Sequence, residues 1–273
     1  MPADEVPIVV ASTVTKLGPE TRDAVMLGAS HGGVIAGYLA AKAGARAVIL
    51  NDAGVGLDDA GVSSLPYLDK LGIPAATVDY RSARIGDAKD MAARGRISRV
   101  NAAAKGLGCS AGMTASQCAE RMRKAKPYRG EAPHYEEARF TFREAPGEPK
   151  VIGVDSASLV APEDVGQIVV TASHGALLSG ETASAIKYDV LACAFNDAGF
   201  GADDIGASRL PALDQRGIAA VVLDCMTARI GDARSAWETG KVSRANAVAT
   251  KLGVKPGMTT QQFAEAVIRN RKK

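Results

Sequence analysis

Two stretches of this chain repeat each other, and the repetition constrains the fold more than any other feature. Ala24–Gly33 is an apolar run that leads into Ser-His-Gly-Gly, and Gln167–Gly175 repeats the run with the same Ser-His-Gly. His174 follows His31 by 143 positions, and later motifs recur at 145 positions. The recurring motifs are Asn51–Asp59 with Asn196–Asp204, Ala83–Ala88 with Ala228–Ala233, Ser98–Ala102 with Ser243–Ala247, and Gly112–Thr114 with Gly257–Thr259. The chain is therefore predicted to be a tandem duplication of a domain-sized unit.

Each copy alternates short apolar segments with segments of helical spacing. Such alternation predicts an α/β fold with mostly parallel sheets covered by helices on both faces. In the first copy the expected strands are Ile8–Ala11, Ala24–Gly28, Ala47–Leu50 and Ala75–Val78, and in the second Val151–Val154, Ile168–Thr171, Val190–Phe195 and Ala220–Leu223. The expected helices of the first copy are Val34–Ala43, Ser64–Leu71, Ala88–Arg94, Ser98–Leu107 and Ala115–Lys124, and a helix is also expected after Ser-His-Gly in the second copy.

Prolines and charges mark the boundary between the copies. We expect a first repeat over residues 1–125, a linker over 126–150 and a second repeat over 151–273. Within the linker, Arg139–Arg143 alternates strictly between polar and aromatic residues, which predicts an edge strand or one arm of a hairpin.

The composition is that of a globular protein, with 47% hydrophobic and 23% charged residues and a net charge of +3. Basic residues are scattered, apart from the tail Arg269–Lys273, which is expected to be a frayed end, and aromatic residues are few. Nucleic acid is therefore not an expected partner. Four cysteines without a C-x-x-C pair indicate reduced, mostly buried thiols. No signal peptide opens at Met1–Glu5 and no apolar run spans a bilayer, so a cytoplasmic protein without membrane contact is expected.

The repeated polar motifs follow predicted strands, and the carboxyl ends of parallel strands share one edge of a sheet, where ligands bind. We therefore expect the motifs to form a site. The candidate catalytic residues are His31, His174, Ser30, Ser173, Asp52 and Asp197. The candidate substrate-binding residues are Arg84, Arg229, Asn51, Asn196, Gly32, Gly175, Asp87, Asp232 and Arg81.

Histidine and serine allow different roles at this edge. A neutral imidazole near pH 7 suits proton transfer, and both copies hold His31 or His174 at a strand end. Gly28–Gly32 matches the G-x-S-x-G nucleophile elbow, although the second copy has Thr171 in place of the first glycine. The alternative for Ser30 and its repeat is helix N-capping, which is compatible with an anion site at the helix start.

The remaining motifs also allow a structural and a functional interpretation. Asn51-Asp52-Ala53-Gly54 is typical turn chemistry, yet Asn51 could bind a substrate carbonyl and Asp52 could orient a histidine. Arg84 could form an ion pair with Asp87 at a helix start, or it could hold a substrate carboxylate or phosphate.

Cofactor signatures are absent from the sequence. His31, Asp52 and Asp87 would make a plausible metal set, but no H-x-x-x-H or C-x-x-C spacing supports it. No G-x-G-x-x-G follows the first strand, so a dinucleotide site is not expected. We expect neither a metal nor another cofactor.

These features favour a cofactor-independent enzyme, a hydrolase or lyase, that acts on a small polar and carboxylated metabolite. Differences between the copies, such as Ser12 against Asp155, suggest one composite site between the halves across a pseudo-twofold axis. Open alternatives are a non-catalytic anion-binding or sensor protein, a serine hydrolase that uses Ser30 or Ser173, and a purely structural duplication. A homo-oligomer is also compatible with the sequence.

Overall fold

Two α/β units make up the structure, a computed structural model that describes residues 5–271. Unit 1 comprises the residues up to Val55, Asp59–Glu136 and the short segment Gly201–Asp203. Unit 2 comprises Gly56–Asp58, Glu137–Phe200 and the residues from Asp204 on.

Unit 1 has a mixed sheet of five strands in the order β1-β2-β3-β4-β5. The first four strands are parallel and the last is antiparallel to its neighbour. The strands are β1 (Ile8–Ala11), β2 (Val25–His31), β3 (Ala47–Asn51), β4 (Ala75–Val78) and β5 (Ile97–Val100).

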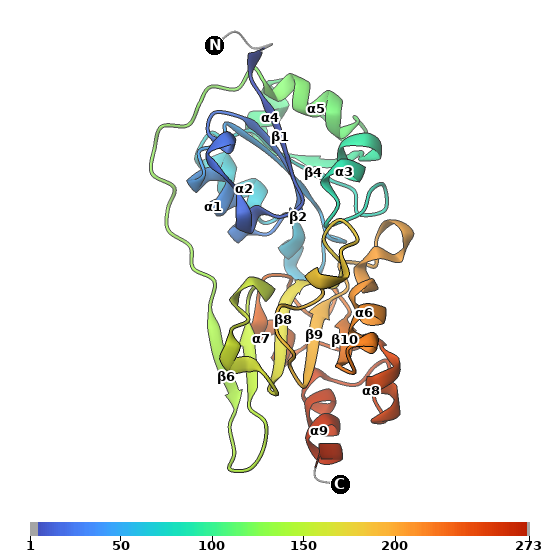
Figure 1. Cartoon of the computed structure of the whole chain (residues 1–273). Coiled ribbons are helices and arrows are strands. Elements are labelled where there is room, and N and C mark those ends of the chain that lie inside the picture. The colour runs from blue at the N-terminus through green and yellow to red at the C-terminus, as the bar shows by residue number, and fades with distance from the viewer. Residues whose placement is uncertain (1–4, 272–273) are drawn as a thin grey trace. The chain divides into compact units, whose positions relative to one another are not determined.

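Helices cover both faces of this sheet because successive strand residues point to opposite sides. Val25 and Leu27 of β2 pack with α3 (Ala88–Arg94), α4 (Ala102–Gly106) and α5 (Ala115–Met122). Met26 between them packs with α1 (Val34–Lys42) and α2 (Ser64–Lys70). Figure 1 shows α1 and α2 on one side of the unit 1 sheet and α3 and α5 on the other.

Unit 2 repeats this plan with one strand more, in the order β11-β10-β9-β8-β7-β6. Its parallel strands are β7 (Val151–Val154), β8 (Ile168–His174), β9 (Ala192–Asn196) and β10 (Ala219–Leu223), and its antiparallel edge strands are β6 (Arg139–Arg143) and β11 (Val242–Ala245). One face packs with α6 (Arg209–Gln215), and the other with α7 (Ala233–Glu238), α8 (Ala247–Lys251) and α9 (Thr260–Arg271). The predicted duplicated α/β fold is confirmed.

Short 3-10 turns complete the list of elements: Val14–Lys16, Pro19–Thr21, Leu57–Val62, Ala157–Leu159, Pro162–Asp164, Thr182–Ser184 and Ala202–Ala207.

Two helix predictions are wrong. Ser98–Leu107 is not one helix, because Ile97–Val100 pairs with β4 and the helix starts only after Asn101, whose side chain accepts the Ala104 N–H. After His174, residues 175–191 contain no α-helix and only one 3-10 turn. There Ser179 and Gly180 have φ of 49° and 76°, a left-handed conformation that ends a right-handed helix.

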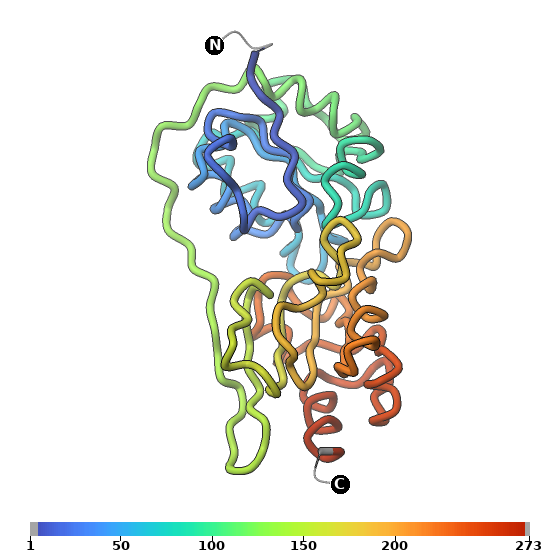
Figure 2. The backbone as a smooth tube through the Cα atoms, viewed as in Figure 1, coloured from blue at the N-terminus to red at the C-terminus, as the bar shows by residue number. Residues whose placement is uncertain are grey.

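Residues 126–138 run as an extended segment without helix or strand (Figure 2). Within unit 1 this segment is held by Arg129, which pairs with Asp23 at 2.8 and 3.0 Å, and by Tyr67, whose hydroxyl donates to the Pro133 carbonyl at 2.9 Å. These bonds fix the extended chain to unit 1 as far as Pro133.

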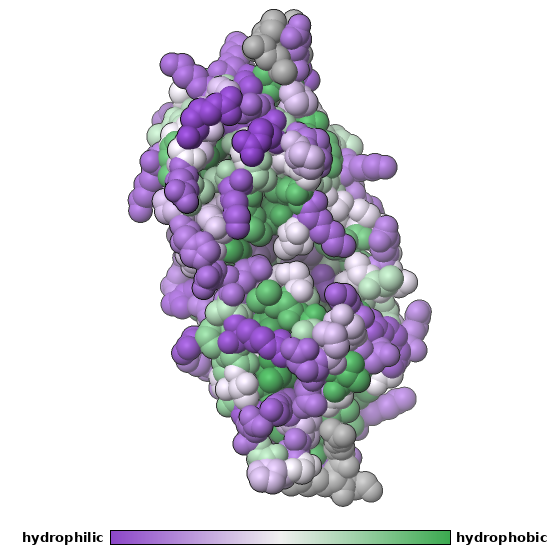
Figure 3. All heavy atoms as spheres, turned by 60° about the vertical axis from the view of Figure 1, so that its left-hand side comes forward, coloured by the Kyte–Doolittle hydropathy of each residue, from purple (hydrophilic) through white to green (hydrophobic). Residues whose placement is uncertain are grey.

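Exposed apolar side chains are scattered, and Figure 3 shows small hydrophobic areas bordered by hydrophilic residues. All four cysteines are buried and free, as predicted. No helix within residues 5–271 has the length and apolar character needed to cross a membrane. In the basic tail, α9 continues to Arg271. The expectation of a frayed end is therefore wrong for Arg269–Arg271. Lys272 and Lys273, and Met1–Asp4 at the other terminus, lie outside the described residues.

Candidate functional site

In each unit the repeated motifs meet where the parallel strands end. His31 at the end of β2 is in register with Asn51 at the end of β3, and the Gly32 N–H donates to the Asn51 carbonyl at 2.6 Å. The Gly86 N–H, from the Ala-Arg-Ile-Gly-Asp motif, donates to the carbonyl of Ala29 in β2 at 2.8 Å.

Unit 2 makes the same contacts. His174 is in register with Asn196, the Gly175 N–H donates to the Asn196 carbonyl at 2.8 Å, and the Gly231 N–H donates to the Ala172 carbonyl at 2.9 Å. The shared backbone geometry explains why these motifs are repeated in the same order.

Gly32 and Gly175 are required by close packing. A Cβ atom at Gly32 would lie 2.5 Å from the Gly61 carbonyl oxygen, and one at Gly175 would lie 2.2 Å from the Gly206 carbonyl oxygen. Their backbone N–H groups are already bonded to Asn51 and Asn196. Both glycines therefore let the strand end approach the next loop.

His31 is partly buried, and its ring has a defined hydrogen-bonding direction. Nδ1 accepts the Gly33 N–H at 3.1 Å, so the neutral ring carries its proton on Nε2. Burial lowers the pKa of His31 from 6.5 to about 4, and the N-terminus of α1, which follows at once, disfavours the charged ring in the same sense. His31 is therefore a neutral hydrogen-bond donor at pH 7.

His174 adopts the same local arrangement in unit 2. Its Nδ1 accepts the Ala176 N–H at 3.3 Å, and the side chain is buried, with 6% of its surface exposed. The two histidines thus share the Nδ1 contact, but the chain that follows them differs.

Ser30 and Ser173 do not cap helices, which corrects that prediction. Ser30 lies inside β2 and its hydroxyl accepts the Val14 N–H at 3.0 Å, while the N-cap of α1 is Gly33. The Ser173 hydroxyl accepts the Ala157 N–H at 2.8 Å. Both hydroxyls therefore tie their strand, β2 or β8, to the loop that follows the neighbouring parallel strand, β1 or β7.

The third histidine of the chain, His134, is held by residues other than Ser30. His134 lies in the extended segment, where Nδ1 is 3.1 Å from the Tyr38 hydroxyl and Nε2 is 2.9 Å from Glu136. These contacts engage both ring nitrogens of His134 with partners other than the serine.

Asn51 and Asn196 fold the loops that follow them. Each is buried, and each side-chain oxygen accepts the N–H two residues on, Ala53 in unit 1 and Ala198 in unit 2, at 2.9 Å. The Asn196 amide also donates to the Ala228 carbonyl at 2.9 Å. The bonds to the Ala53 and Ala198 N–H groups are those of an Asx turn.

Asp52 and Asp197 are buried carboxyl groups that bind backbone. Asp52 Oδ1 accepts N–H groups from Gly54 at 3.2 Å and Tyr80 at 3.0 Å. Asp197 Oδ1 accepts those of Gly199 at 2.9 Å and Cys225 at 3.0 Å. Burial raises the pKa of both carboxyls, although these N–H groups and a nearby serine hydroxyl oppose the shift.

A run of left-handed residues follows each of these aspartates, and the sequence did not reveal it. Ala53, Gly54, Val55 and Gly56 have φ of 50°, 75°, 63° and 73°. The corresponding residues Ala198, Gly199, Phe200 and Gly201 have φ of 49°, 71°, 63° and 68°. A left-handed conformation costs an L-residue roughly 1–2 kcal/mol, so both loops are strained. The Asn and Asp side chains offset this strain.

The arginines of the repeated motifs form ion pairs. In unit 1, Arg84 Nε is 2.9 Å from Asp203, and its Nη1 is 3.9 Å from Asp90. In unit 2, Arg229 lies 2.6 Å from Asp58 and 3.4 Å from Asp232. All these pairs include partly exposed side chains and are worth little stability.

Asp87 and Asp232 are helix N-caps. The Asp87 side chain accepts the Asp90 N–H at 3.1 Å at the start of α3, and Asp232 accepts the Ser235 N–H at 3.0 Å at the start of α7. Arg81 pairs with Asp79 at 2.9 Å and its side chain is 72% exposed. Asp79 therefore holds the Arg81 guanidinium at the protein surface.

Among the described residues, Asp197, Asp224 and Cys225 have potential ligand atoms within 4.8 Å of one another, as a metal site would need. Burial, followed by the nearby carboxylates, raises the pKa of Cys225 to about 12, so its thiol keeps its proton at pH 7. Asp197 is already bonded to two N–H groups. The contacts of Asp197 and Cys225 therefore fit a hydrogen-bonded cluster.

Comparison with known proteins finds no matching family model, and no curated protein or solved structure matches the chain significantly.

Proposed function

We propose that the chain is an enzyme for a small, polar, carboxylated metabolite, a hydrolase or lyase, and that His31 acts on the substrate through Nε2–H as a hydrogen-bond donor. The observation that supports this role is the bond from the Gly33 N–H to Nδ1, together with a pKa of about 4. A neutral imidazole held in this tautomer can polarise a carbonyl by donating the Nε2–H hydrogen bond to its oxygen. Hydrolysis of a carboxylic acid derivative and elimination beside a carbonyl can both use a hydrogen-bond donor of this kind.

The arginines are the proposed anchors for the substrate's anionic group. Arg84 and Arg229 have 41% and 48% of their side chains exposed, and their partners Asp203 and Asp58 are exposed as well. An exposed ion pair exchanges its carboxylate at low cost. A substrate carboxylate would take the place of the aspartate.

A specific observation also favours a second candidate, a non-catalytic protein that binds the same metabolite. Ser30, Asn51 and Asp52, three of the candidate polar groups, are engaged with backbone N–H groups. On this alternative the repeated motifs shape a binding loop, and no proton is transferred.

Turnover measurements on the whole chain distinguish the two candidates. Purified protein is incubated with a mixture of hydroxy, amino and amide derivatives of small carboxylic acids, and ¹H NMR follows their consumption. We expect one component to be consumed, and His31→Gln to slow this at least 100-fold while binding is retained. Saturable binding without conversion would establish the second candidate, and equal rates for His31→Gln would rule out the role of His31.

An independent measurement tests the ring itself. ¹⁵N NMR of the imidazole nitrogens is expected to show a protonated Nε2 at pH 7 and a midpoint near pH 4 for His31. The His31→Gln spectrum assigns the signal. A proton on Nδ1, or a midpoint near 6.5, would contradict the proposed donor.

A further inference from the structure

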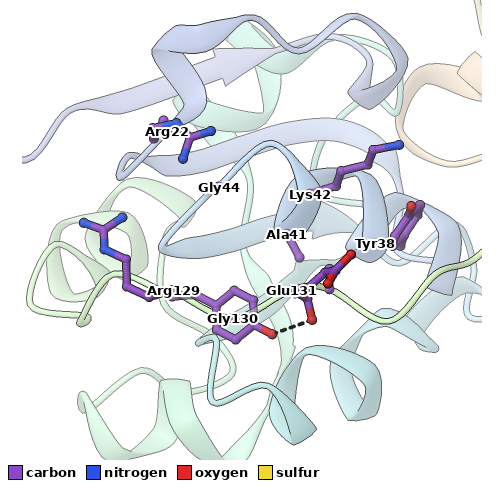
Figure 4. A pocket seen from close by; sticks show the side chains of 10 residues that line it. Arg22, Tyr38, Ala41, Lys42, Gly44, Arg129, Gly130 and Glu131 are labelled. Atoms are coloured by element: carbon purple, nitrogen blue, oxygen red, sulfur yellow. Dashed lines mark hydrogen bonds between the residues drawn. The ribbon is translucent and has the colours of Figure 1, made fainter.

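A pocket of about 470 Å³ lies in unit 1, between the second half of α1 and the extended segment. Small residues of both elements, Ala41, Gly44 and Gly130, line it together with Tyr38 and Tyr128. Figure 4 shows Arg22 and Arg129 on one side of this pocket, and Lys42 with Tyr38 on the other.

The pocket depends on elements that unit 1 alone possesses. One wall is α1, whereas the corresponding residues 175–191 of unit 2 form no α-helix. The other wall is the extended segment, which Arg129 and Tyr67 fix to unit 1. The pocket is therefore not part of the repeated structure.

The lining carries more positive than negative charge. Arg22, Lys42 and Arg129 face it, against the single carboxylate of Glu131. Arg129 pairs with Asp23, but among the described residues no ion pair is found for Arg22 or Lys42. Lys42 Nζ lies over the Tyr38 ring, 5.6 Å from its centre.

The end of α1 does not account for these cations. The N–H groups of Ala43, Gly44 and Ala45 close the helix by donating to the carbonyls of Leu39, Ala41 and Ala40. The helix dipole offsets only about half a charge at this end. Arg22 and Lys42 therefore remain cations without an ion pair among the described residues, on opposite sides of the pocket, with Glu131 on the Lys42 side (Figure 4).

We propose that this pocket binds a small organic dianion, with one acidic group at the Arg22 side, the other at the Lys42 side, and a planar or apolar middle against the tyrosines. Pockets of this kind combine apolar walls with a few charged groups that fix the ligand's orientation. α1 has nine residues, so its two ends are about 13 Å apart. His31 precedes the opposite end, and the dianion site is thus separate from the proposed catalytic site.

Isothermal titration calorimetry of the whole chain with terephthalate and benzoate tests the proposal. Both probes are planar, but only terephthalate carries a carboxylate at each end. We expect terephthalate to bind at least 10-fold more tightly than benzoate, and Arg22→Ala and Lys42→Ala each to weaken its binding at least 5-fold. Lys70→Ala, an exposed cation in the last turn of α2, is the matched control and should change nothing.

Three results would overturn the proposal: equal affinity for the two probes, unchanged binding in both pocket variants, or no saturable binding of terephthalate. His31→Gln should leave terephthalate binding unchanged, because the two sites lie at opposite ends of α1. Loss of turnover in that variant with intact terephthalate binding keeps the two proposals separate, and chemical denaturation checks that every variant is folded.

Discussion

The chain after His31 and the chain after His174 start from the same strand end but fold differently. Residues 34–42 form the alanine-rich helix α1, whose backbone groups satisfy one another. Residues 175–191 contain Ser179 and Gly180 in the left-handed conformation and form no α-helix. Where such a segment is buried, as it is at Ala176 and Ala185, its carbonyl groups need other donors.

One substitution supplies those donors. Ser64 in unit 1 corresponds to Arg209 in unit 2, and both side chains are buried. Arg209 donates from Nε to the Ala176 carbonyl at 3.0 Å and from Nη1 to the Ala185 carbonyl at 2.6 Å, and its guanidinium lies 4.7 Å from the centre of the Phe195 ring. A guanidinium thus replaces a helix as the source of backbone hydrogen bonds, while the strand ends stay the same.

The largest expected effect tests this replacement. Arg209→Met leaves the Ala176 and Ala185 carbonyls buried without donors, and should lower the free energy of unfolding by about 4 kcal/mol. Ser64→Ala is the matched control in unit 1. The Ser64 hydroxyl is buried without a hydrogen-bond partner, so its removal should cost less than about 0.5 kcal/mol. Urea denaturation followed by circular dichroism measures both, and a loss below 1 kcal/mol for Arg209→Met would show that the segment is held by other contacts.

The second prediction concerns a feature that the units share. A Cβ atom on Gly61 would lie 2.1 Å from the Asp52 carbonyl oxygen, and one on Gly206 would lie 1.9 Å from the Asp197 carbonyl oxygen. Because backbone must move in either case, Gly61→Ala and Gly206→Ala should each cost about 3 kcal/mol in urea denaturation. Gly72→Ala is the control for backbone strain alone. An added Cβ atom there meets no neighbour within 4 Å, but φ is 67°. Unequal losses at Gly61 and Gly206 would mean that the two loops are not equivalent.

Sequence reasoning succeeded where the physical signal is local. Apolar runs such as Ala47–Leu50 predict buried parallel strands, and the repeated motifs predict one architecture for both copies. The prediction of a helix after His174 was wrong. The segment departs from a helix at Ser179 and Gly180, and its carbonyl groups are bonded by Arg209, which is distant in sequence. Tertiary contacts of this kind have no local pattern.

The candidate site shows the same division. Ser-His-Gly and Asn-Asp-Ala-Gly could be placed at strand ends from the alternation alone. The left-handed Val55 could not be predicted, because a β-branched residue strongly disfavours positive φ. The roles of Ser30 and Asp52 depend on N–H groups of Val14 and Tyr80, which only the folded chain brings near.

The third prediction uses the pKa of His31. Between pH 6.5 and about 4 the unfolded chain binds a proton at His31 that the folded chain does not, so stability falls as the pH is lowered through this range. From pH 6.5 to 5 the expected loss is about 2 kcal/mol. His31→Gln should lack this loss of stability. Urea denaturation gives the free energy of unfolding of both proteins at each pH, and the difference between them isolates the contribution of His31. The same slope in both proteins would show that the folded-state pKa of His31 is not depressed.

The smallest expected effect returns to the chain after the two histidines. Gly33 has no side chain to cap α1, and the Ser63 hydroxyl instead accepts the Val34 N–H at 2.9 Å. In unit 2 the Ser208 hydroxyl accepts the Leu177 N–H at 2.8 Å, although no α-helix follows.

Ser63→Ala and Ser208→Ala should therefore each lower the free energy of unfolding by about 1 kcal/mol, the usual cost of a lost cap. Equal losses in urea denaturation would mean that the serine serves the strand end in both units, and that the helix came to depend on it only in unit 1. A loss confined to Ser63→Ala would contradict this, because the serine would then matter only where a helix starts.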